Sequence, residues 1–368
     1  MPRLIGFEAP SPRRTWLASQ VLSAIMLLTA CGPEESVDSS AASETNTRPL
    51  ETPSVPLNEL LNGATYLGFT GGLYPHGSNT MPAAHSTAGS ASAAAIQPLD
   101  TAGNPSPNGK YVLLSIGMSN TTQEFCSQSG SAPCDSWTFM AKVAADPAVN
   151  KTTLVLANGA SGGQTAPFWD SPTEPNYNRV RDTVLAPKGL SEKQVQILWL
   201  KVANAGPSVS LPNTNADAYQ LKASIGAILR AAKSRYPNLK QVFLSSRIYA
   251  GYATTALSPE PYAYENGFSV KWLIEAQIRQ KAQGTIDSHA GNLDYTSGVV
   301  PWVAWGPYLW ANGLTPRSDG LTWEQSNFES DGTHPSPSGE NKVSAQLMSF
   351  FKTSPHTRCW FLSGLTCP

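Results

Sequence analysis

The chain has 368 residues, a formal net charge of −1 and a charged fraction of only 14%. This balance gives no basic surface of the kind that binds nucleic acid and no acidic tail, so we expect neutral or mildly polar partners. The length allows one large domain after an N-terminal leader, and the 29 glycines and 30 prolines indicate many loops.

The N-terminal residues have the features of an export signal. Three arginines precede an apolar stretch, residues 16–28, that is short for a membrane span. The stretch ends in Leu28-Thr29-Ala30-Cys31, which resembles the lipobox of bacterial lipoproteins. That resemblance implies a signal peptide at residues 1–30, a lipid anchor on Cys31, and a place in the bacterial envelope, at the outer membrane on its periplasmic face or at the cell surface. An ordinary cleaved signal is the alternative.

Composition divides the rest of the chain. Residues 31–56 are rich in Glu, Ser, Thr and Pro, which is typical of a flexible tether. We expect one domain over residues 57–368. Within it, residues 57–109 show little periodicity and predict an extended segment wrapped over the domain, residues 110–351 form the core, and residues 352–368 form a tail that bears a disulfide.

Four cysteines lie in the predicted domain: Cys126, Cys134, Cys359 and Cys367. Two short-range disulfides, Cys126 with Cys134 and Cys359 with Cys367, are the simplest pairing among three, and an oxidising compartment permits any of them. Neither pair has the spacing of metal ligands, so we expect no metal site.

Apolar runs of strand length alternate with helical segments along the core. The predicted strands are residues 111–116, 152–157, 195–202, 241–246 and 299–305, and the predicted helices are residues 136–145, 215–236, 267–283 and 338–351. A loop that holds Cys126 and Cys134 is expected after the first strand. The alternation predicts an α/β protein with three α/β/α layers and a mainly parallel five-stranded sheet.

The chemistry-bearing residues follow these strands. Ser119, Gly163 and Asn204 each come after a predicted strand, so they can line one edge of the sheet. A serine becomes a nucleophile when a histidine takes its proton and a carboxylate orients that histidine. Asp331 and His334 are three residues apart, and in a helical turn they would share a face.

In chain order, Gly117-Met118-Ser119-Asn120, Gly163, Asn204 and Asp331-x-x-His334-Pro335 resemble the conserved blocks of the SGNH (GDSL-like) hydrolases. The serine block is most similar to that of sialate O-acetylesterase-like members. The resemblance covers residues 110–351 and implies a flavodoxin-like fold without a cofactor. It also implies a triad of Ser119, Asp331 and His334, with oxyanion donors at the Ser119 and Gly163 N–H groups and the Asn204 side chain.

Several alternatives stay open at these blocks. The run Asn158-Gly159-Ala160-Ser161-Gly162-Gly163 could supply another glycine, and Asn204 lacks the usual glycine two residues before it, so Gln164 or Lys201 could donate instead. The same run fits the G-x-S-x-G elbow with Ser161 as nucleophile. That motif needs a helix directly after the serine, and the prolines at 167 and 172 disfavour one.

Gln164, Arg247, Tyr264 and Trp305 are our candidate substrate contacts. The aromatic residues 302–323 could form a platform for a sugar or acyl chain, although core packing is the commoner use. We expect an envelope-anchored serine esterase that works through an acyl-enzyme and deacetylates O-acetylated carbohydrate. A lipid esterase or thioesterase is one alternative. A catalytically silent glycan-binding or envelope-assembly lipoprotein is another, and the sequence gives no oligomeric state.

Overall fold

A computed structural model describes residues 55–367 of the chain. The predicted signal peptide, the lipid-bearing Cys31 and nearly all of the predicted tether lie outside these residues, so they stay predictions. No helix within residues 55–367 combines the length and the hydropathy that a membrane span requires.

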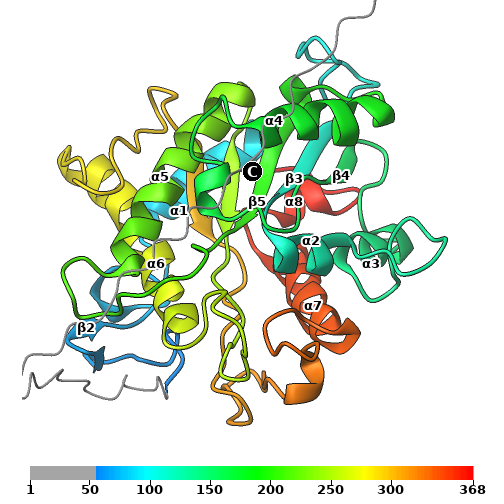
Figure 1. Ribbon diagram of the computed structural model, residues 1–368. Coiled ribbons are helices and arrows are strands. Elements are labelled where there is room, and N and C mark those ends of the chain that lie inside the picture. Colours follow the sequence, from blue (N-terminus) through cyan, green and yellow to red (C-terminus); the bar gives the residue numbers. More distant parts are fainter. Residues whose placement is uncertain (1–54, 368) are drawn as a thin grey trace, which may run out of the picture. The chain divides into compact units, whose positions relative to one another are not determined.

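Five parallel strands form the central sheet (Figure 1). They are β3 (Tyr111–Gly117), β4 (Leu154–Asn158), β5 (Val195–Lys201), β6 (Gln241–Leu244) and β7 (Trp302–Trp305), and their spatial order is β4-β3-β5-β6-β7. Each neighbouring pair is parallel. Every residue of β3 and β5 is buried, as strands covered on both faces require. The predicted parallel sheet of five strands is confirmed.

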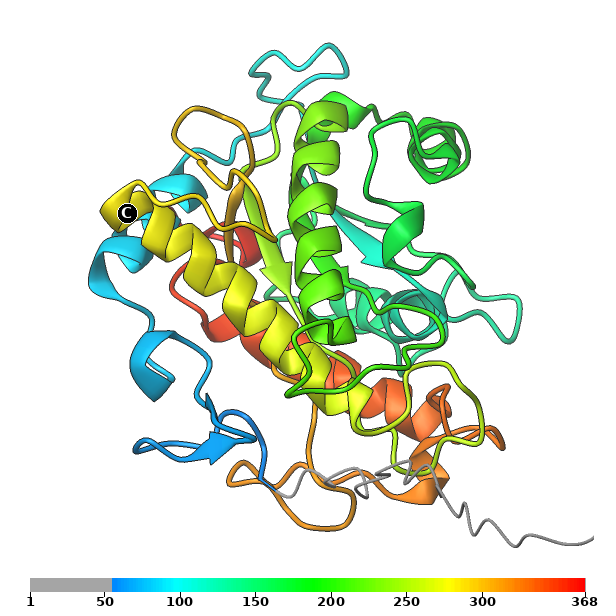
Figure 2. The ribbon, with the colours of Figure 1, turned by 60° about the vertical axis from the view of Figure 1, so that its left-hand side comes forward.

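Helices cover both faces of this sheet. On one face lie α5 (Asp217–Arg235) and α6 (Tyr262–Gln283), which cross in front of the strands in Figure 2. On the other lie α2 (Ser119–Cys126), α3 (Phe139–Ala145), α7 (Pro337–Thr353) and α8 (Arg358–Phe361), whose apolar residues share a second core. The protein therefore has the predicted α/β/α layers.

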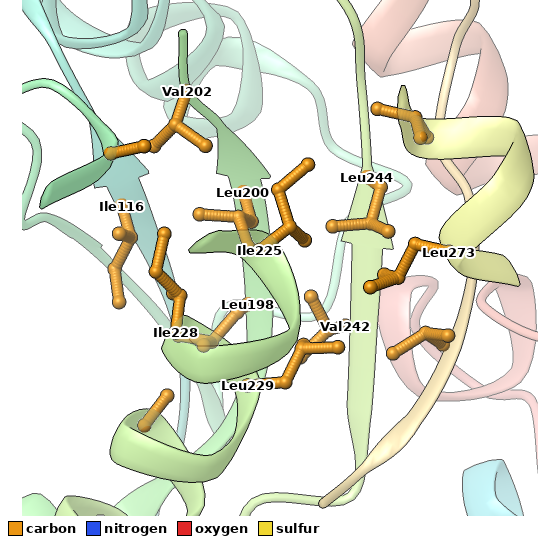
Figure 3. Close-up of a cluster of buried hydrophobic side chains, with 14 of the residues drawn as sticks. Ile116, Leu198, Leu200, Val202, Ile225, Ile228, Leu229, Val242, Leu244 and Leu273 are labelled. Atoms are coloured by element: carbon orange, nitrogen blue, oxygen red, sulfur yellow. The ribbon is translucent and has the colours of Figure 1, made fainter. Parts of the chain in front are cut away.

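The alternation of side chains along each strand builds the two cores. Ile116, Leu198 and Leu244 of the sheet face α5 and α6, with Ile228 beside Ile116 and Leu198, and Leu273 beside Leu244 (Figure 3). The intervening strand residues, such as Leu113 and Trp199, belong to the core on the α2–α7 side. The continuous apolar character of the strands follows from this double burial.

The remaining elements are short. A hairpin joins β1 (Thr65–Tyr66) to β2 (Phe69–Thr70), and α4 (Pro175–Arg179) continues into a π-helical turn, Val180–Leu185. Short 3₁₀ turns occupy Pro75–Gly77, Ala166–Phe168, Ala186–Lys188, Glu192–Gln194 and Gln325–Asn327. The two predicted disulfides, Cys126–Cys134 and Cys359–Cys367, are both present.

The prediction of an extended segment over residues 57–109 was wrong in part, because it contains helix α1 (Ala83–Ala94). This helix is rich in alanine, which has the highest helix propensity, but it has no bulky apolar residue to mark a periodic face. It packs closely on β7: a Cβ at Gly89 would lie 2.4 Å from the ring of Trp302.

The loop predicted after the first strand was also wrong, because that segment begins with helix α2. Its sequence, SNTTQEFC, contains residues of modest helix propensity, and packing against α7 and β3 stabilises it instead. The error matters because α2 begins at Ser119.

The order of the strands explains where a ligand should bind. The chain moves from β3 to β4 on one side and then to β5 on the other, so the connections after β3 and β5 pass over opposite faces of the sheet. In parallel sheets a crevice opens at such a switch point, outside the carboxyl ends of the strands. Ser119 follows β3 and Asn204 follows β5.

Candidate active site

Ser119 stands at the junction between β3 and α2. Gly117 makes this junction possible, because a Cβ there would lie 2.2 Å from the carbonyl oxygen of Lys201 and 2.4 Å from Oγ1 of Thr121. The Thr121 hydroxyl donates to the same Lys201 oxygen at 2.6 Å. The start of α2 is thus fixed against the end of β5, with Ser119 as its first residue.

Two hydrogen bonds join Ser119 to the predicted base and acid. Nε2 of His334 lies 2.8 Å from Oγ of Ser119, and Nδ1 of His334 lies 2.5 Å from Oδ2 of Asp331. An ionised carboxylate only accepts, so the neutral imidazole carries its proton on Nδ1 and Nε2 accepts from the serine hydroxyl. The chain that they form has the geometry of a Ser-His-Asp triad.

The acid and base lie in a tight turn rather than in the helical turn that their spacing suggested. Oδ1 of Asp331 accepts from the backbone N–H groups of Thr333 at 2.9 Å and His334 at 3.0 Å, and the Glu329 N–H closes the turn on the His334 carbonyl at 2.9 Å. Burial alone would raise the pKa of Asp331. The hydrogen bonds from His334 and Thr333 outweigh it, so the pKa lies below its usual value.

Gly332 allows this turn to press against the loop after β6. Its φ is +62°, and a Cβ would lie 1.9 Å from the carbonyl oxygen of Tyr252. Beside it, the N–H of Thr254 donates to the Asp331 carbonyl at 2.9 Å. The position of His334 therefore depends on a glycine that its own sequence motif places between acid and base.

A cavity of ≈ 340 Å³ opens at this edge of the sheet and brings together Ser119 and His334 of the predicted triad with the other two predicted oxyanion residues, Gly163 and Asn204. It is lined by Met118, Ser119, Asn120, Gly162, Gly163, Thr165, Ala203, Asn204, Ala205, Arg247, Leu257, Ser258, Thr333 and His334. Within residues 55–367, neither the Gly163 N–H nor the Asn204 side chain has a hydrogen-bond partner. The Ser119 N–H, at the start of α2, is likewise free of an intrahelical acceptor. These groups are available as oxyanion donors.

The cavity lining narrows the choice of oxyanion donor among the glycines that follow β4. Gly162 and Gly163 both line it, and Gly163 has a φ of +74°. Gly159 does not line the cavity, and its N–H already donates to Oγ of Ser115 at 3.1 Å. Gln164 is also outside the lining, and its side-chain oxygen accepts from Asn176 at 2.7 Å.

Lys201 is held away from the cavity by a buried ion pair. Both Lys201 and Glu124 are fully buried, and the ammonium contacts both carboxylate oxygens, one of them at 2.6 Å. Burial lowers the pKa of Lys201 and raises that of Glu124, and the opposite charge of the partner opposes both shifts. The sequence did not predict this ion pair, because the position of a lysine at a strand end does not reveal that its side chain is buried.

Of the four predicted substrate contacts, Gln164, Tyr264 and Trp305 are all outside the cavity lining. The Tyr264 hydroxyl donates to the Val55 carbonyl at 2.9 Å, and the Trp305 indole N–H donates to the Leu73 carbonyl at 2.7 Å. The side chains of Tyr264 and Trp305 are buried in the core on the α5–α6 side of the sheet. Their assignment to the site was wrong, because aromatic composition alone does not separate a core from a platform.

Arg247 does line the cavity, together with residues that the sequence did not single out as site residues. Asn120 links two sides of the site: its amide N–H donates to the Thr333 carbonyl at 2.9 Å, and its oxygen accepts from Nη1 of Arg247 at 3.0 Å. Residues 55–367 hold no group of three or more His, Cys, Asp or Glu side chains that could bind a metal ion.

Ser161 has a different setting from Ser119. A turn follows it instead of a helix, and its backbone N–H donates to the Gly117 carbonyl at 3.1 Å. Among the described residues its hydroxyl has no hydrogen bond to a histidine. The structure therefore gives Ser161 neither the helix nor the base that a nucleophile elbow requires.

No protein-family model and no curated protein matches the chain. Solved structures do align with it. A protein described as a GDSL-like lipase from Parabacteroides merdae covers 69% of this chain and 97% of its own at 14% identity, with a TM-score of 0.34. An extracellular lipase from Streptomyces rimosus covers 65% and 99% at 13% identity, with a TM-score of 0.31. A carbohydrate esterase family 2 enzyme from Corynascus thermopiles covers 66% and 67% at 12% identity, with a TM-score of 0.34. Similarity at this level does not assign a family, so the function rests on the geometry of the site.

Proposed function

We propose that the protein is a serine ester hydrolase that works through an acyl-enzyme. The observation that carries this proposal is the continuous chain from Asp331 through His334 to Ser119, with bonds of 2.5 and 2.8 Å. Such a chain supplies a nucleophile, a base that takes its proton, and a carboxylate that orients the base and stabilises the imidazolium.

The reaction runs in two halves. Ser119 attacks the ester carbonyl while Nε2 of His334 takes its proton, and the oxyanion is stabilised by the N–H groups of Ser119 and Gly163 and the amide of Asn204. His334 then protonates the leaving alcohol. In the second half, water attacks the acyl-enzyme by the same route and releases the acid.

For the substrate, we propose an ester with a short acyl group, with an O-acetylated carbohydrate as the leading candidate. The serine block resembles that of acetylesterase-like proteins, and much of the cavity wall is small: Gly162, Gly163, Ala203 and Ala205. The larger apolar side chains in the lining are only Met118 and Leu257, which provide little surface for a long lipid chain.

We also propose that the enzyme is a lipid-anchored protein of the bacterial envelope, at the outer membrane. This rests on the likeness of residues 28–31 to a lipobox. The alternative of a catalytically silent envelope lipoprotein predicts that no hydrolysis depends on Ser119. A hydrolysis assay with a Ser119 variant therefore decides between this alternative and the esterase.

The test measures hydrolysis of 4-nitrophenyl acetate, butyrate and octanoate by the purified protein and by two serine variants. Ser119→Ala should lose at least about 10³-fold in kcat, as removal of a triad serine does. Ser161→Ala is the matched control, and its rate should stay within about threefold of the parent, a change of under 1 kcal/mol in the barrier. Equal turnover by the parent and Ser119→Ala would contradict the proposal.

A further inference from the structure

Arg247 is a buried cation on the wall of the active-site cavity. Its side chain is only 2% exposed, and it lies just beyond the end of β6. A guanidinium carries five N–H donors in a planar fork. Nη1 donates to Asn120 at 3.0 Å and Nη2 makes a long bond to the Leu257 carbonyl at 3.4 Å, while Nε is buried without any partner. Much of its donor capacity is unused.

Among the described residues, no carboxylate contacts this guanidinium. Burial lowers the pKa of Arg247, and Glu124, Glu260 and Asp331 oppose that shift from a distance. None of these carboxylates hydrogen-bonds to the guanidinium, although Glu260 has no ion pair of its own in the described part of the chain. Glu124 pairs with Lys201, Glu260 accepts from the Trp310 indole at 2.7 Å, and Asp331 binds His334. Within residues 55–367, Arg247 has no ion pair.

The rest of the cavity lining offers Arg247 no anionic side chain. The lining contains no Asp, Glu or Lys, and apart from His334 its one ionisable side chain is Arg247. The free N–H of Gly163 and the free amide of Asn204 are accounted for by the oxyanion. A buried cation that lacks a partner is unfavourable unless an anion completes the site.

We propose that Arg247 binds a carboxylate carried by the substrate, so that the preferred substrates are anionic esters. A guanidinium fork binds a carboxylate through two parallel hydrogen bonds. The carboxylate can belong to the acyl half, as in the half-ester of a dicarboxylic acid, or to the alcohol half, as in an acetylated sugar acid. This inference rests on the proposed function, since it concerns the same cavity.

The test compares matched anionic and neutral esters in two arms. The acyl arm uses mono-4-nitrophenyl glutarate against methyl 4-nitrophenyl glutarate, and the alcohol arm uses O-acetyl galacturonic acid against O-acetyl galactose. We expect the anionic member of one arm to have a kcat/KM at least tenfold higher, mostly through KM. The arm that shows this preference identifies the half that carries the carboxylate.

Three variants assign the preference to Arg247. Arg247→Gln should bring the ratio close to one, and Arg247→Lys should keep part of it. Arg181→Gln removes an exposed arginine and should leave the ratio unchanged, which controls for net charge. If Arg247→Gln instead lowers kcat equally for both members of a pair, the residue only positions Asn120 and the proposal is wrong.

A binding measurement separates this inference from the proposed function. In the Ser119→Ala protein, titration calorimetry should detect glutarate but not glutaramide, and Arg247→Gln or Arg247→Lys should weaken glutarate binding. Ser119-dependent hydrolysis with no anionic preference in either arm would overturn the inference and leave the esterase intact. If no ester is hydrolysed, the esterase proposal fails, and the absence of glutarate binding would then overturn the inference as well.

Discussion

The side-chain amide of Asn120 holds the turn that carries His334, because its Nδ2 donates to the Thr333 carbonyl at 2.9 Å. Asn120 directly follows Ser119, so one residue ties the nucleophile to the segment that supplies its base, more than two hundred residues later in the chain. Its oxygen meanwhile accepts from Arg247. The hydrogen bond between Asn120, which is next to Ser119, and Thr333, which is next to His334, thus fixes the relative position of Ser119 and His334.

Asn120→Ala should therefore impair catalysis more than folding. A small displacement of His334 costs about 10²-fold in kcat, while loss of the buried hydrogen bonds lowers the free energy of unfolding by about 1–3 kcal/mol. Steady-state kinetics and urea unfolding measure the two effects. Asn150→Ala is the control. It removes a side-chain amide just before β4, at the amino-terminal ends of the strands and away from the site, and it should leave kcat unchanged. A loss of stability without a loss of kcat would contradict this role.

Gly332→Ala should damage the site through its backbone. The residue has a φ of +62°, and its Cβ would lie 1.9 Å from the Tyr252 carbonyl, so the turn must move. We expect a loss of about 1–3 kcal/mol of stability and a large fall in kcat. Gly364 has a similar φ of +73° with open space around it, so Gly364→Ala measures the cost of backbone strain without a steric clash. Equal effects of the two variants would refute the packing argument.

The Lys201–Glu124 pair predicts strong coupling between two substitutions. Lys201→Met leaves a fully buried carboxylate without its cation and should lower the free energy of unfolding by about 3–5 kcal/mol. The double variant with Glu124→Leu should recover most of that loss, since it removes both charges. Lys352→Met breaks a more exposed pair with Asp146 and should cost less than about 1 kcal/mol. Additive effects of the two core substitutions would argue against a coupled pair.

Glu265 predicts a dependence of stability on pH. Burial raises its pKa to about 7, against the hydrogen bonds from the Leu211 N–H and the Tyr66 hydroxyl. The folded state therefore holds this proton more tightly than the unfolded state, so its stabilising effect is complete below about pH 4.5 and is lost as the pH rises through about 7. Glu265→Gln should remove this loss, which is on the order of 2–3 kcal/mol between pH 4.5 and 8.

Urea unfolding of the parent and of Glu265→Gln at several pH values checks this prediction. The pKa of Glu340 is also raised to about 7, but Glu340 is present in both proteins and cancels in their difference. A difference in unfolding free energy that does not change with pH would show that the pKa of Glu265 is the same in the folded and unfolded states, which contradicts the prediction.

The sequence predicted the sheet because strands buried on both faces are continuous apolar runs, as in β3 and β5. It predicted the proximity of Ser119, Asp331 and His334 because each belongs to a short motif at a position that the parallel sheet brings to one edge. The sequence did not predict the alanine-rich α1 or the polar α2 as helices, because neither has a clear apolar face. The misplaced Tyr264 and Trp305, and the unforeseen pair of Lys201 with Glu124, show the same limit: burial depends on the packing of distant segments.

Covalent labelling is the decisive test of whether Ser119 is the nucleophile. The purified protein is treated with a fluorophosphonate, digested and mapped by mass spectrometry. We expect a single phosphonylated serine at Ser119, with labelling abolished in Ser119→Ala, strongly slowed in Asp331→Asn and unchanged in Ser161→Ala. Labelling at Ser161, or equal labelling of the parent and Ser119→Ala, would contradict it.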